Sequence, residues 1–482
     1  MSLLKAKDIS VADGDERLLS PLSIDLVPGE PLIILGETGS GKSLMAQALM
    51  GTLPAGLKAS GRVAVSGRVL NASDPAGFRG LWGREIGVLP QEPWLSLDPL
   101  MRASEQIAES HVLVRGLNRR GATERATSDL AAFDLADAGR RYPHDLSGGM
   151  AQRVAIAAAR AGGAKIIIAD EPTKGLDAAR RDSVANLLLS EMGESGGLLV
   201  ITHDLALARR IGGQVIVLRS GEIVESGATE QVFAAPAQAY TRELIAADPE
   251  HWTPRDKGNA GGDPVVSGSG LSLARGGKML FRDLSISVRQ GSVFGVTGPS
   301  GCGKSSFGDV LLGLAKPMQG SVRRRAGDAP TAFQKLYQDP VSAFPRRRTL
   351  RQSIEDVARL SGRATDVIDA LMDRLGLAPK LLDRRPDAVS GGELQRLSLL
   401  RVLLMRPSFI FADEPTSRLD PITQARVISL LTGVADQDGV AVMLVSHDRA
   451  LIRNTADDAL QMGEVDENSL QFPEACAASV LQ

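Results

Sequence analysis

The chain has few cysteines, few aromatic residues and no surplus of charge of one sign. Its 482 residues include two cysteines, Cys302 and Cys476, which cannot form a four-cysteine metal site and disfavour a disulfide framework, so we expect a reducing compartment. The 55 basic and 57 acidic residues give a formal net charge of −2, which provides no overall field for nucleic acid or an anionic membrane. No run approaches the roughly 20 apolar residues that cross a bilayer, and residues 1–8 resemble a strand more than a signal peptide. We expect no membrane-spanning segment.

A glycine-rich pattern, G-x-x-x-x-G-K-S, occurs twice, each time between an apolar strand-like run and a helix-like segment. In such a loop the backbone N–H groups surround a phosphate group at the positive end of the following helix. The lysines would reach the β- and γ-phosphates and the serines would bind Mg²⁺. The alternative, two ordinary strand-to-helix turns, does not explain a complete double match. The predicted phosphate-binding residues are Gly36, Glu37, Thr38, Gly39, Ser40, Gly41, Lys42 and Ser43, and Gly298, Pro299, Ser300, Gly301, Cys302, Gly303, Lys304 and Ser305.

Further short motifs recur at nearly constant spacing in the two halves of the chain. A carboxylate that ends an apolar parallel strand lies at the sheet edge beside the phosphate loop, where it can hold the Mg²⁺ sphere, and the next glutamate can polarise the attacking water. A histidine after the following strand is expected to contact the γ-phosphate, although a lone histidine there is more often structural. The recurring residues are Ser147, Gly148, Gly149, Asp170, Glu171 and His203, and then Ser390, Gly391, Gly392, Asp413, Glu414 and His447.

The length suggests about two to four domains, and the repeat selects two. We expect a first domain at residues 1–250, a flexible Gly-rich linker at 251–267 and a second domain at 268–482. Each half begins with strands, continues with a helical stretch and ends with alternating strands and helices, which predicts an α/β doubly wound sheet with added subdomains. The second half is shorter between its phosphate loop and Gln338, so its β-subdomain should be reduced.

Together these motifs resemble the ATPase component of ATP-binding cassette transporters, with two cassettes fused in one chain. The resemblance adds the Gln loops at Gln91 and Gln338 and the D-loops at Leu176-Asp177 and Leu419-Asp420. It implies two tandem P-loop cassettes, each with a RecA-like parallel-sheet core, an antiparallel β-subdomain and an α-helical subdomain. It also implies that the cassettes pack head to tail around two ATP molecules, so that each Ser-Gly-Gly signature faces the other cassette's phosphate loop. The implied Mg²⁺ ligands are Ser43, Gln91, Asp170, Ser305, Gln338 and Asp413.

The stretch after each Gln is similar to that of oligopeptide, dipeptide and nickel importers, some of whose fused members carry glutathione. The resemblance implies an ATP-hydrolysing subunit for import of peptides, nickel or related solutes, peripheral to the cytoplasmic face of the inner membrane. Two permease subunits and a solute-binding protein would be its partners, with no nucleic acid. The alternative is a soluble tandem-cassette ATPase acting on ribosomes or DNA, which would need a long charged linker, zinc cysteines or coiled coils. None of these is present in the sequence.

Some residues depart from the family pattern or extend it. Asp13 and Arg275 stand near the places where an aromatic side chain usually stacks on adenine, and Met150 replaces the usual Gln or Glu after the first signature. Because the lysine, carboxylates and histidine are complete in both halves, we expect two competent sites. The apolar residues after each Gln are predicted to dock a cytoplasmic helix of a permease, although each could instead be core. They are Trp94, Leu95, Leu97, Val341, Ala343 and Phe344.

Overall fold

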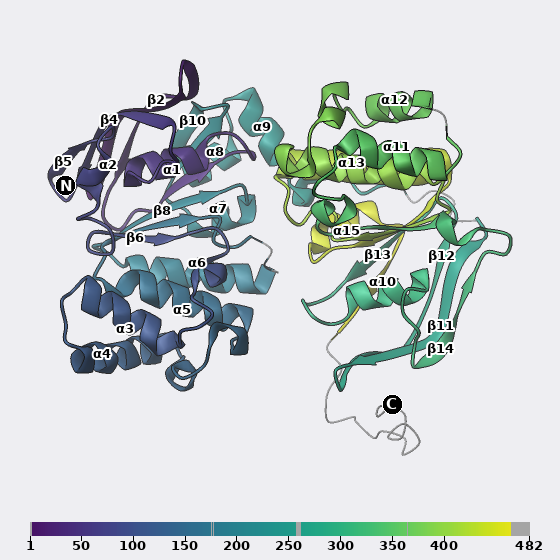
Figure 1. Ribbon diagram of the computed structural model, residues 1–482, viewed down its shortest axis with the longest axis horizontal. Coiled ribbons are helices and arrows are strands. Elements are labelled where there is room, and N and C mark those ends of the chain that lie inside the picture. Colours follow the sequence, from purple (N-terminus) through teal and green to yellow (C-terminus); the bar gives the residue numbers. More distant parts are fainter. Residues whose placement is uncertain (1, 175, 177, 257–261, 364, 464–482) are drawn as a thin grey trace. The chain divides into compact units, whose positions relative to one another are not determined.

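The computed structural model describes residues 2–463, except 175, 177, 257–261 and 364 (Figure 1). Cys476, Asp177 of the first D-loop and the middle of the predicted linker lie outside these residues. The chain forms two compact units, residues 1–248 with 420–422, and residues 249–419 with 423 onward. No helix within the described part of the chain has the length and apolar character of a membrane span.

The first unit contains a four-stranded antiparallel sheet of order β2-β1-β4-β5. Buried and exposed residues alternate along much of β1, so that Leu4 and Ala6 enter the core while Lys5 faces solvent, as expected for a sheet with one wet face. This sheet forms the predicted β-subdomain. Its strands are β1 (Leu4–Asp13), β2 (Glu16–Leu26), β4 (Leu57–Val65) and β5 (Arg68–Asn71).

A six-stranded sheet of order β10-β9-β3-β8-β7-β6 forms the centre of the first unit, and all its pairs are parallel except β9 with β10. Every residue of β3 and β8 is buried, because helices and the antiparallel sheet cover both faces. Ile33 packs in the core with the helices of one face, and Ile34 packs with α1 and the antiparallel sheet. The strands are β3 (Leu32–Leu35), β6 (Ile86–Leu89), β7 (Ile166–Asp170), β8 (Gly197–Thr202), β9 (Gln214–Arg219) and β10 (Glu222–Ala228).

Helices surround this sheet and build the α-helical subdomain (Figure 1). In that subdomain α3 and α4 pack with α5 through small and branched side chains, including Ile107, Leu130 and Val154. The helices are α1 (Lys42–Met50), α2 (Pro75–Phe78), α3 (Ala103–Leu113), α4 (Arg119–Ala132), α5 (Gly148–Ala161), α6 (Ala178–Met192), α7 (Leu205–Ile211), α8 (Thr229–Ala234) and α9 (Ala239–Ala246).

The second unit repeats this plan with a smaller antiparallel sheet of three strands, β12-β11-β14, which agrees with the reduced β-subdomain expected from the sequence. Its parallel sheet has the order β15-β16-β17-β13-β18. The strands are β11 (Pro264–Arg275), β12 (Lys278–Arg289), β13 (Val293–Thr297), β14 (Gln319–Arg324), β15 (Phe333–Leu336), β16 (Phe409–Asp413), β17 (Ala441–Val445) and β18 (Asp458–Gln461). The helices are α10 (Lys304–Leu312), α11 (Leu350–Leu360), α12 (Thr365–Arg374), α13 (Gly391–Leu404), α14 (Pro421–Asp438) and α15 (Arg449–Thr455). The α/β fold, with the same plan in both units, is therefore confirmed.

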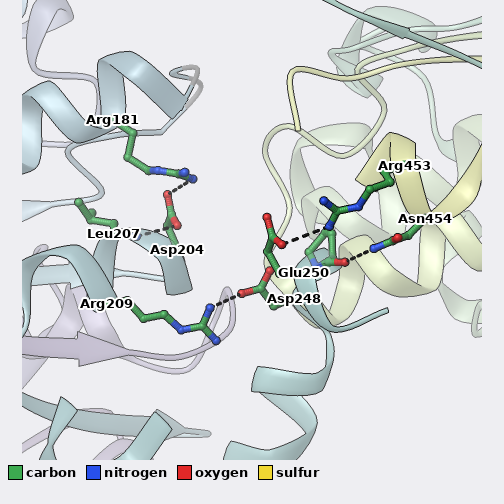
Figure 2. A network of polar contacts seen from close by, with 9 residues as sticks. Arg181, Asp204, Leu207, Arg209, Asp248, Glu250, Arg453 and Asn454 are labelled. Carbon is green, nitrogen blue, oxygen red and sulfur yellow. Dashed lines mark hydrogen bonds and ion pairs between the residues drawn. The ribbon is translucent and has the colours of Figure 1, made fainter. Parts of the chain in front are cut away.

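The residues on either side of 257–261 are fixed by polar contacts. Glu250 pairs with Arg453 at 3.3 Å, and the side-chain amide of Asn454 donates to the Pro249 carbonyl at 2.7 Å (Figure 2). Further along, Arg255 pairs with Asp436 and, at 2.8 Å, with Asp457. Strand β11 begins at residue 264, inside the stretch 251–267 that was predicted to be a flexible linker. The first and last parts of that stretch are thus ordered parts of the second unit.

Candidate nucleotide sites

The first phosphate loop joins β3 to α1, and its glycines adopt conformations that other residues rarely reach. Gly39 and Gly41 have φ angles of 85° and 98°, in the left-handed region that favours glycine. A Cβ on Gly36 would lie 2.2 Å from the Leu218 carbonyl oxygen, so no side chain fits there. The buried Ser40 hydroxyl has no hydrogen-bond partner among the described residues. The curled backbone has the form expected of a phosphate cradle.

Lys42 is the first residue of α1, and its side chain folds back over the loop. Its Nζ donates to the carbonyl oxygens of Gly36 and Glu37, both at 2.8 Å, and the residue is only 6% exposed. Burial lowers the pKa of the Lys42 ammonium, and the Glu171 and Asp170 carboxylates offset part of that shift. The ammonium is therefore held over the curled backbone of the loop.

The second phosphate loop, between β13 and α10, has the same geometry. Gly301 and Gly303 have φ angles of 82° and 99°. Lys304 donates to the carbonyl oxygens of Gly298 at 2.8 Å and Pro299 at 3.0 Å. Cys302 is buried in the core of the β-subdomain and P-loop helix. Both predicted loops thus form alike, one in each unit.

An aspartate ends each of the strands β7 and β16, and the glutamate after it has a backbone conformation that the sequence did not predict. Asp170 and Asp413 are the last residues of these strands. Glu171 and Glu414 follow with φ angles of 49° and 46°, and a positive φ is uncommon for a residue other than glycine. Such an unusual conformation at the same place in both units suggests a functional constraint. It turns each glutamate toward the histidine that follows the neighbouring strand.

In the first unit, Glu171 is directly hydrogen-bonded to His203. The distance from Glu171 Oε1 to His203 Nδ1 is 2.7 Å, and the Thr202 hydroxyl donates to Oε2 at 3.4 Å. Burial alone would raise the pKa of Glu171, but the adjacent His203 holds it below its ordinary value. Burial would lower the pKa of His203, and Glu171 raises it above its usual range. The pair therefore keeps the glutamate ionised and oriented.

In the second unit, Glu414 has more partners and a longer contact with its histidine. Its Oε2 lies 3.5 Å from His447 Nδ1 and accepts a hydrogen bond from the Gln338 amide at 3.0 Å, and its Oε1 is 3.7 Å from Lys304 Nζ. Burial would raise the pKa of Glu414, but His447 and Lys304 hold it below its ordinary value. The two sites thus share their residues and differ in their hydrogen bonds.

The predicted Mg²⁺ ligands are only partly brought together. The Ser305 hydroxyl donates to Asp413 Oδ1 at 2.9 Å. Burial raises the pKa of Asp170, and the nearby Ser43 hydroxyl offsets part of that shift. A serine hydroxyl beside one carboxylate suits Mg²⁺, which is usually held by one or two carboxylates and substrate phosphates. No cluster of three His, Cys, Asp or Glu side chains suited to a metal occurs among the described residues.

The two Gln-loop glutamines do not join those ligands. Gln338 is bonded to Glu414, not to Asp413. Gln91 is exposed and has no side-chain hydrogen bond to any described residue. The assignment of both glutamines to the metal stays a prediction.

The signature serines begin two long helices. Ser147 is the N-cap of α5 and accepts from the Met150 backbone N–H at 3.3 Å. Ser390 is the N-cap of α13 and has in addition a reciprocal contact, because its hydroxyl donates to Glu393 at 2.7 Å. Two glycines follow each serine, an exposed Gly148 and a half-buried Gly149 in the first unit, and an exposed Gly391 and a half-buried Gly392 in the second. Helix N-termini of this kind bind anions, and their facing across the two cassettes stays a prediction.

The residues predicted to dock a permease differ widely in exposure. Leu97 and Phe344 are buried in the two helical cores, so their assignment to a surface was wrong. Trp94 packs partly against the first core, and Val341 and Ala343 pack partly against the second. Leu95, in the short turn Pro93–Ser96, is 70% exposed. It is the one residue of the first-unit set that offers a largely open apolar surface.

Three contacts near the loops were missed in the sequence. The Glu37 backbone N–H donates to the Tyr240 hydroxyl at 3.1 Å, and burial raises the pKa of Tyr240 to about 12. In the second unit, Lys335 Nζ lies 3.4 Å from Asp413 Oδ2 and 2.8 Å from Asp309 Oδ1. All three contacts join residues far apart in the sequence, so no local pattern predicts them.

Comparison with known proteins identifies relatives over nearly the whole chain. The family model described as ABC transporter matches residues 19–174 and again 281–417. The peptidoglycan transport ATP-binding protein YejF of Agrobacterium fabrum is 31% identical, over 95% of this chain and 91% of its own length. The uncharacterized ABC transporter ATP-binding protein YejF of Escherichia coli K12 is 32% identical, over 97% of this chain and 95% of its own length. The glutathione import ATP-binding protein GsiA of Salmonella paratyphi A is 32% identical, over 89% of this chain and 79% of its own length.

Solved structures that match 92% of this chain share the fold. The RNase-L Inhibitor has a TM-score of 0.62 and 22% identity, covering 92% of this chain and 85% of its own. An archaeal ribosome recycling factor, solved with the ribosomal stalk protein aP1, has a TM-score of 0.64 and 22% identity. The match covers 92% of this chain and 84% of that structure's chain. At these identities the likeness concerns the fold alone.

Proposed function

The chain belongs to the ABC transporter family and carries two of its ATPase cassettes, and from this premise we propose that it hydrolyses ATP at two sites to energise an importer. The observation that carries the proposal is the repeated group of a lysine-bearing phosphate loop, a strand-end aspartate and a glutamate turned toward a histidine. Glu171 contacts His203 at 2.7 Å, and Glu414 lies 3.5 Å from His447. A nucleotide-binding module without hydrolysis would not need an ionised, oriented glutamate at each loop.

In the proposed reaction, water attacks the γ-phosphorus of bound ATP and the bond to the bridging oxygen of ADP breaks. Glu171 accepts a proton from that water, because its lowered pKa keeps the carboxylate ionised near neutral pH. Lys42 binds the phosphate oxygens, and His203 orients Glu171 and contacts the γ-phosphate. Mg²⁺, held by Ser43 and Asp170, would neutralise the charge that develops on the phosphates. The equivalent residues act in the same way in the second cassette.

We propose a peptide or related small solute as cargo, delivered by a solute-binding protein to two permease subunits. This proposal is supported by similarity to relatives whose names state peptidoglycan transport and glutathione import. The similarity extends over most of each relative, so it includes the parts outside the catalytic motifs. The place of action would be the cytoplasmic face of the inner membrane, where the chain would be a peripheral subunit.

The exposed side chain of Leu95 gives a test of this function and of the docking surface together. In proteoliposomes that hold the permease subunits, the wild-type chain should drive ATP-dependent uptake of labelled peptide or glutathione. Leu95→Ala should lower uptake and permease-stimulated hydrolysis together, because a contact with the permease is lost, while basal hydrolysis is unchanged. The matched control is Val69→Ala, at a residue that is 64% exposed on β5. Its uptake should equal that of the wild type.

The two possible failures of this test are distinguishable. If the wild-type chain gives neither uptake nor stimulated hydrolysis, the importer function is contradicted. If the wild type transports and Leu95→Ala transports equally well, only the docking assignment is wrong.

A further inference from the structure

The Mg²⁺ carboxylate of the second cassette already has a cation of the protein beside it. Lys335 Nζ lies 3.4 Å from Asp413 Oδ2 and pairs with Asp309 Oδ1 at 2.8 Å. The lysine is on β15 and is paired in register with Phe411 of β16, two residues before Asp413. Asp309 is on α10, the helix that begins with Lys304. The ion pair is therefore built into the elements that carry the phosphate loop and the metal carboxylate.

The first cassette has no such cation at the corresponding place. Val88 stands three residues before Gln91, as Lys335 stands before Gln338, and it pairs in register with Ile168, two residues before Asp170. Gln47 stands in α1 where Asp309 stands in α10. Asp170 Oδ1 is buried and has no hydrogen-bond partner among the described residues. The first carboxylate thus keeps an open acceptor, whereas the second is shared between Ser305 and Lys335.

The surroundings of Lys335 hold its ammonium in place. The Nζ lies 5.4 Å from the centre of the Phe411 ring and 5.6 Å from that of Tyr337, within the range of cation–π attraction. The lysine side chain is 13% exposed, so water screens its charge weakly. A divalent cation that approached Asp413 would be repelled by this fixed ammonium. ATP without its metal, which has more negative charge, would instead be attracted.

We propose that Lys335 is a positioning residue that makes nucleotide binding at the second site less dependent on Mg²⁺ than binding at the first. This inference rests on the proposed function of the two sites. It follows from linkage, because the factor by which Mg²⁺ tightens nucleotide binding equals the Mg²⁺ affinity of ATP in the site divided by the Mg²⁺ affinity of free ATP. A fixed positive charge beside the metal ligand lowers that factor. We expect it to be about tenfold smaller at the second site, within the usual range of such couplings.

The experiment measures each site separately in the full chain. The Lys42→Met variant reports the second site and the Lys304→Met variant reports the first, each titrated with a fluorescent ATP analogue in excess Mg²⁺ and in EDTA. The ratio of the two dissociation constants should be about tenfold larger at the first site. Binding of Mn²⁺ with the analogue, followed by electron paramagnetic resonance, gives a second readout that requires no hydrolysis.

Matched substitutions exchange the ion pair between the cassettes. Lys335→Val with Asp309→Gln gives the second site the residues of the first and should raise its Mg²⁺ dependence to the first site's value. The reciprocal exchange, Val88→Lys with Gln47→Asp, should lower the Mg²⁺ dependence of nucleotide binding at the first site. Lys335→Arg keeps the charge and should behave as the wild type. If the first exchange does not fold, the reciprocal exchange and the arginine variant still decide the result.

Equal Mg²⁺ dependence at the two wild-type sites, or ratios that the exchanges leave unchanged, would overturn the role of Lys335. In that case nucleotide would still bind at both sites, and the proposed function would stand. A wild-type chain that binds no nucleotide in either condition would instead contradict the proposed function itself.

Discussion

Replacing Glu171 and Glu414 together by glutamine is expected to lower ATP hydrolysis by about 10²- to 10⁴-fold, the usual contribution of a general base. Glutamine has nearly the same size and can keep a hydrogen bond to each histidine, but it cannot take a proton from water. The phosphate loops are unchanged, so ATP should still bind and should accumulate in the protein. Phosphate release in steady state measures the first effect, and retention of labelled ATP on the protein measures the second.

The lowered pKa values of the two glutamates also predict how the wild-type hydrolysis rate depends on pH. Because both glutamates have pKa values below the ordinary value for Glu, protonation of the base should not limit the wild-type rate until the pH is below that range. Glu85→Gln is the control, since the Glu85 side chain accepts a hydrogen bond from the Ser66 hydroxyl and is none of the predicted site residues. Near-normal hydrolysis by the double variant would remove both glutamates from the catalytic role.

Replacing the loop lysine by methionine should abolish tight nucleotide binding at one site and spare the other. Lys42 and Lys304 are each buried, and each ammonium is directed over its loop by two carbonyl oxygens. Methionine keeps the apolar stem and loses the charge. A hydrogen bond to a charged group contributes about 1.5–3 kcal/mol, so the affinity of the altered site should fall by about 10- to 150-fold.

Calorimetric titration of ATP checks this prediction, because it gives the number of tight sites. The wild type should bind two nucleotides, and Lys42→Met or Lys304→Met should each bind one. Lys165→Met, which alters an exposed lysine beside β7, is the control and should bind two. Unchanged stoichiometry in both loop variants would show that these lysines do not hold the phosphates.

The sequence predicted the loops and the strand-end carboxylates because each rests on a local pattern. Glycines at fixed positions between a strand and a helix let the backbone form the curled loop. An aspartate that ends an apolar parallel strand lies at the edge of the sheet. The positive φ of Glu171 and Glu414 could not be predicted, since glutamate has no preference for that region. Sequence alone also gave Gln91 and Gln338 one role, whereas within the described part of the chain Gln338 is hydrogen-bonded to its glutamate and Gln91 is not.

Long-range contacts account for most of the remaining differences. Arg255 is separated from its partner Asp457 by 202 positions, so the polar composition of the predicted linker did not reveal that Arg255 is held by an ion pair. Leu97 and Phe344 have the same apolar character as Leu95, and only the packing of the helical subdomains determines which of them is buried. The pairing of Lys335 with Asp309 and Asp413 depends on three separate elements brought together by the sheet.

The most direct test of the account is the rate of ATP hydrolysis by the purified chain, measured alone, with its permease subunits in proteoliposomes, and with ribosomes. On the proposed function, the chain alone should hydrolyse ATP slowly, because the membrane partner would bring about closure of the two cassettes around ATP. The account predicts that the permease subunits raise the rate and that ribosomes leave it unchanged. A rate that ribosomes raise and the permease does not would contradict the assignment of this chain to solute import.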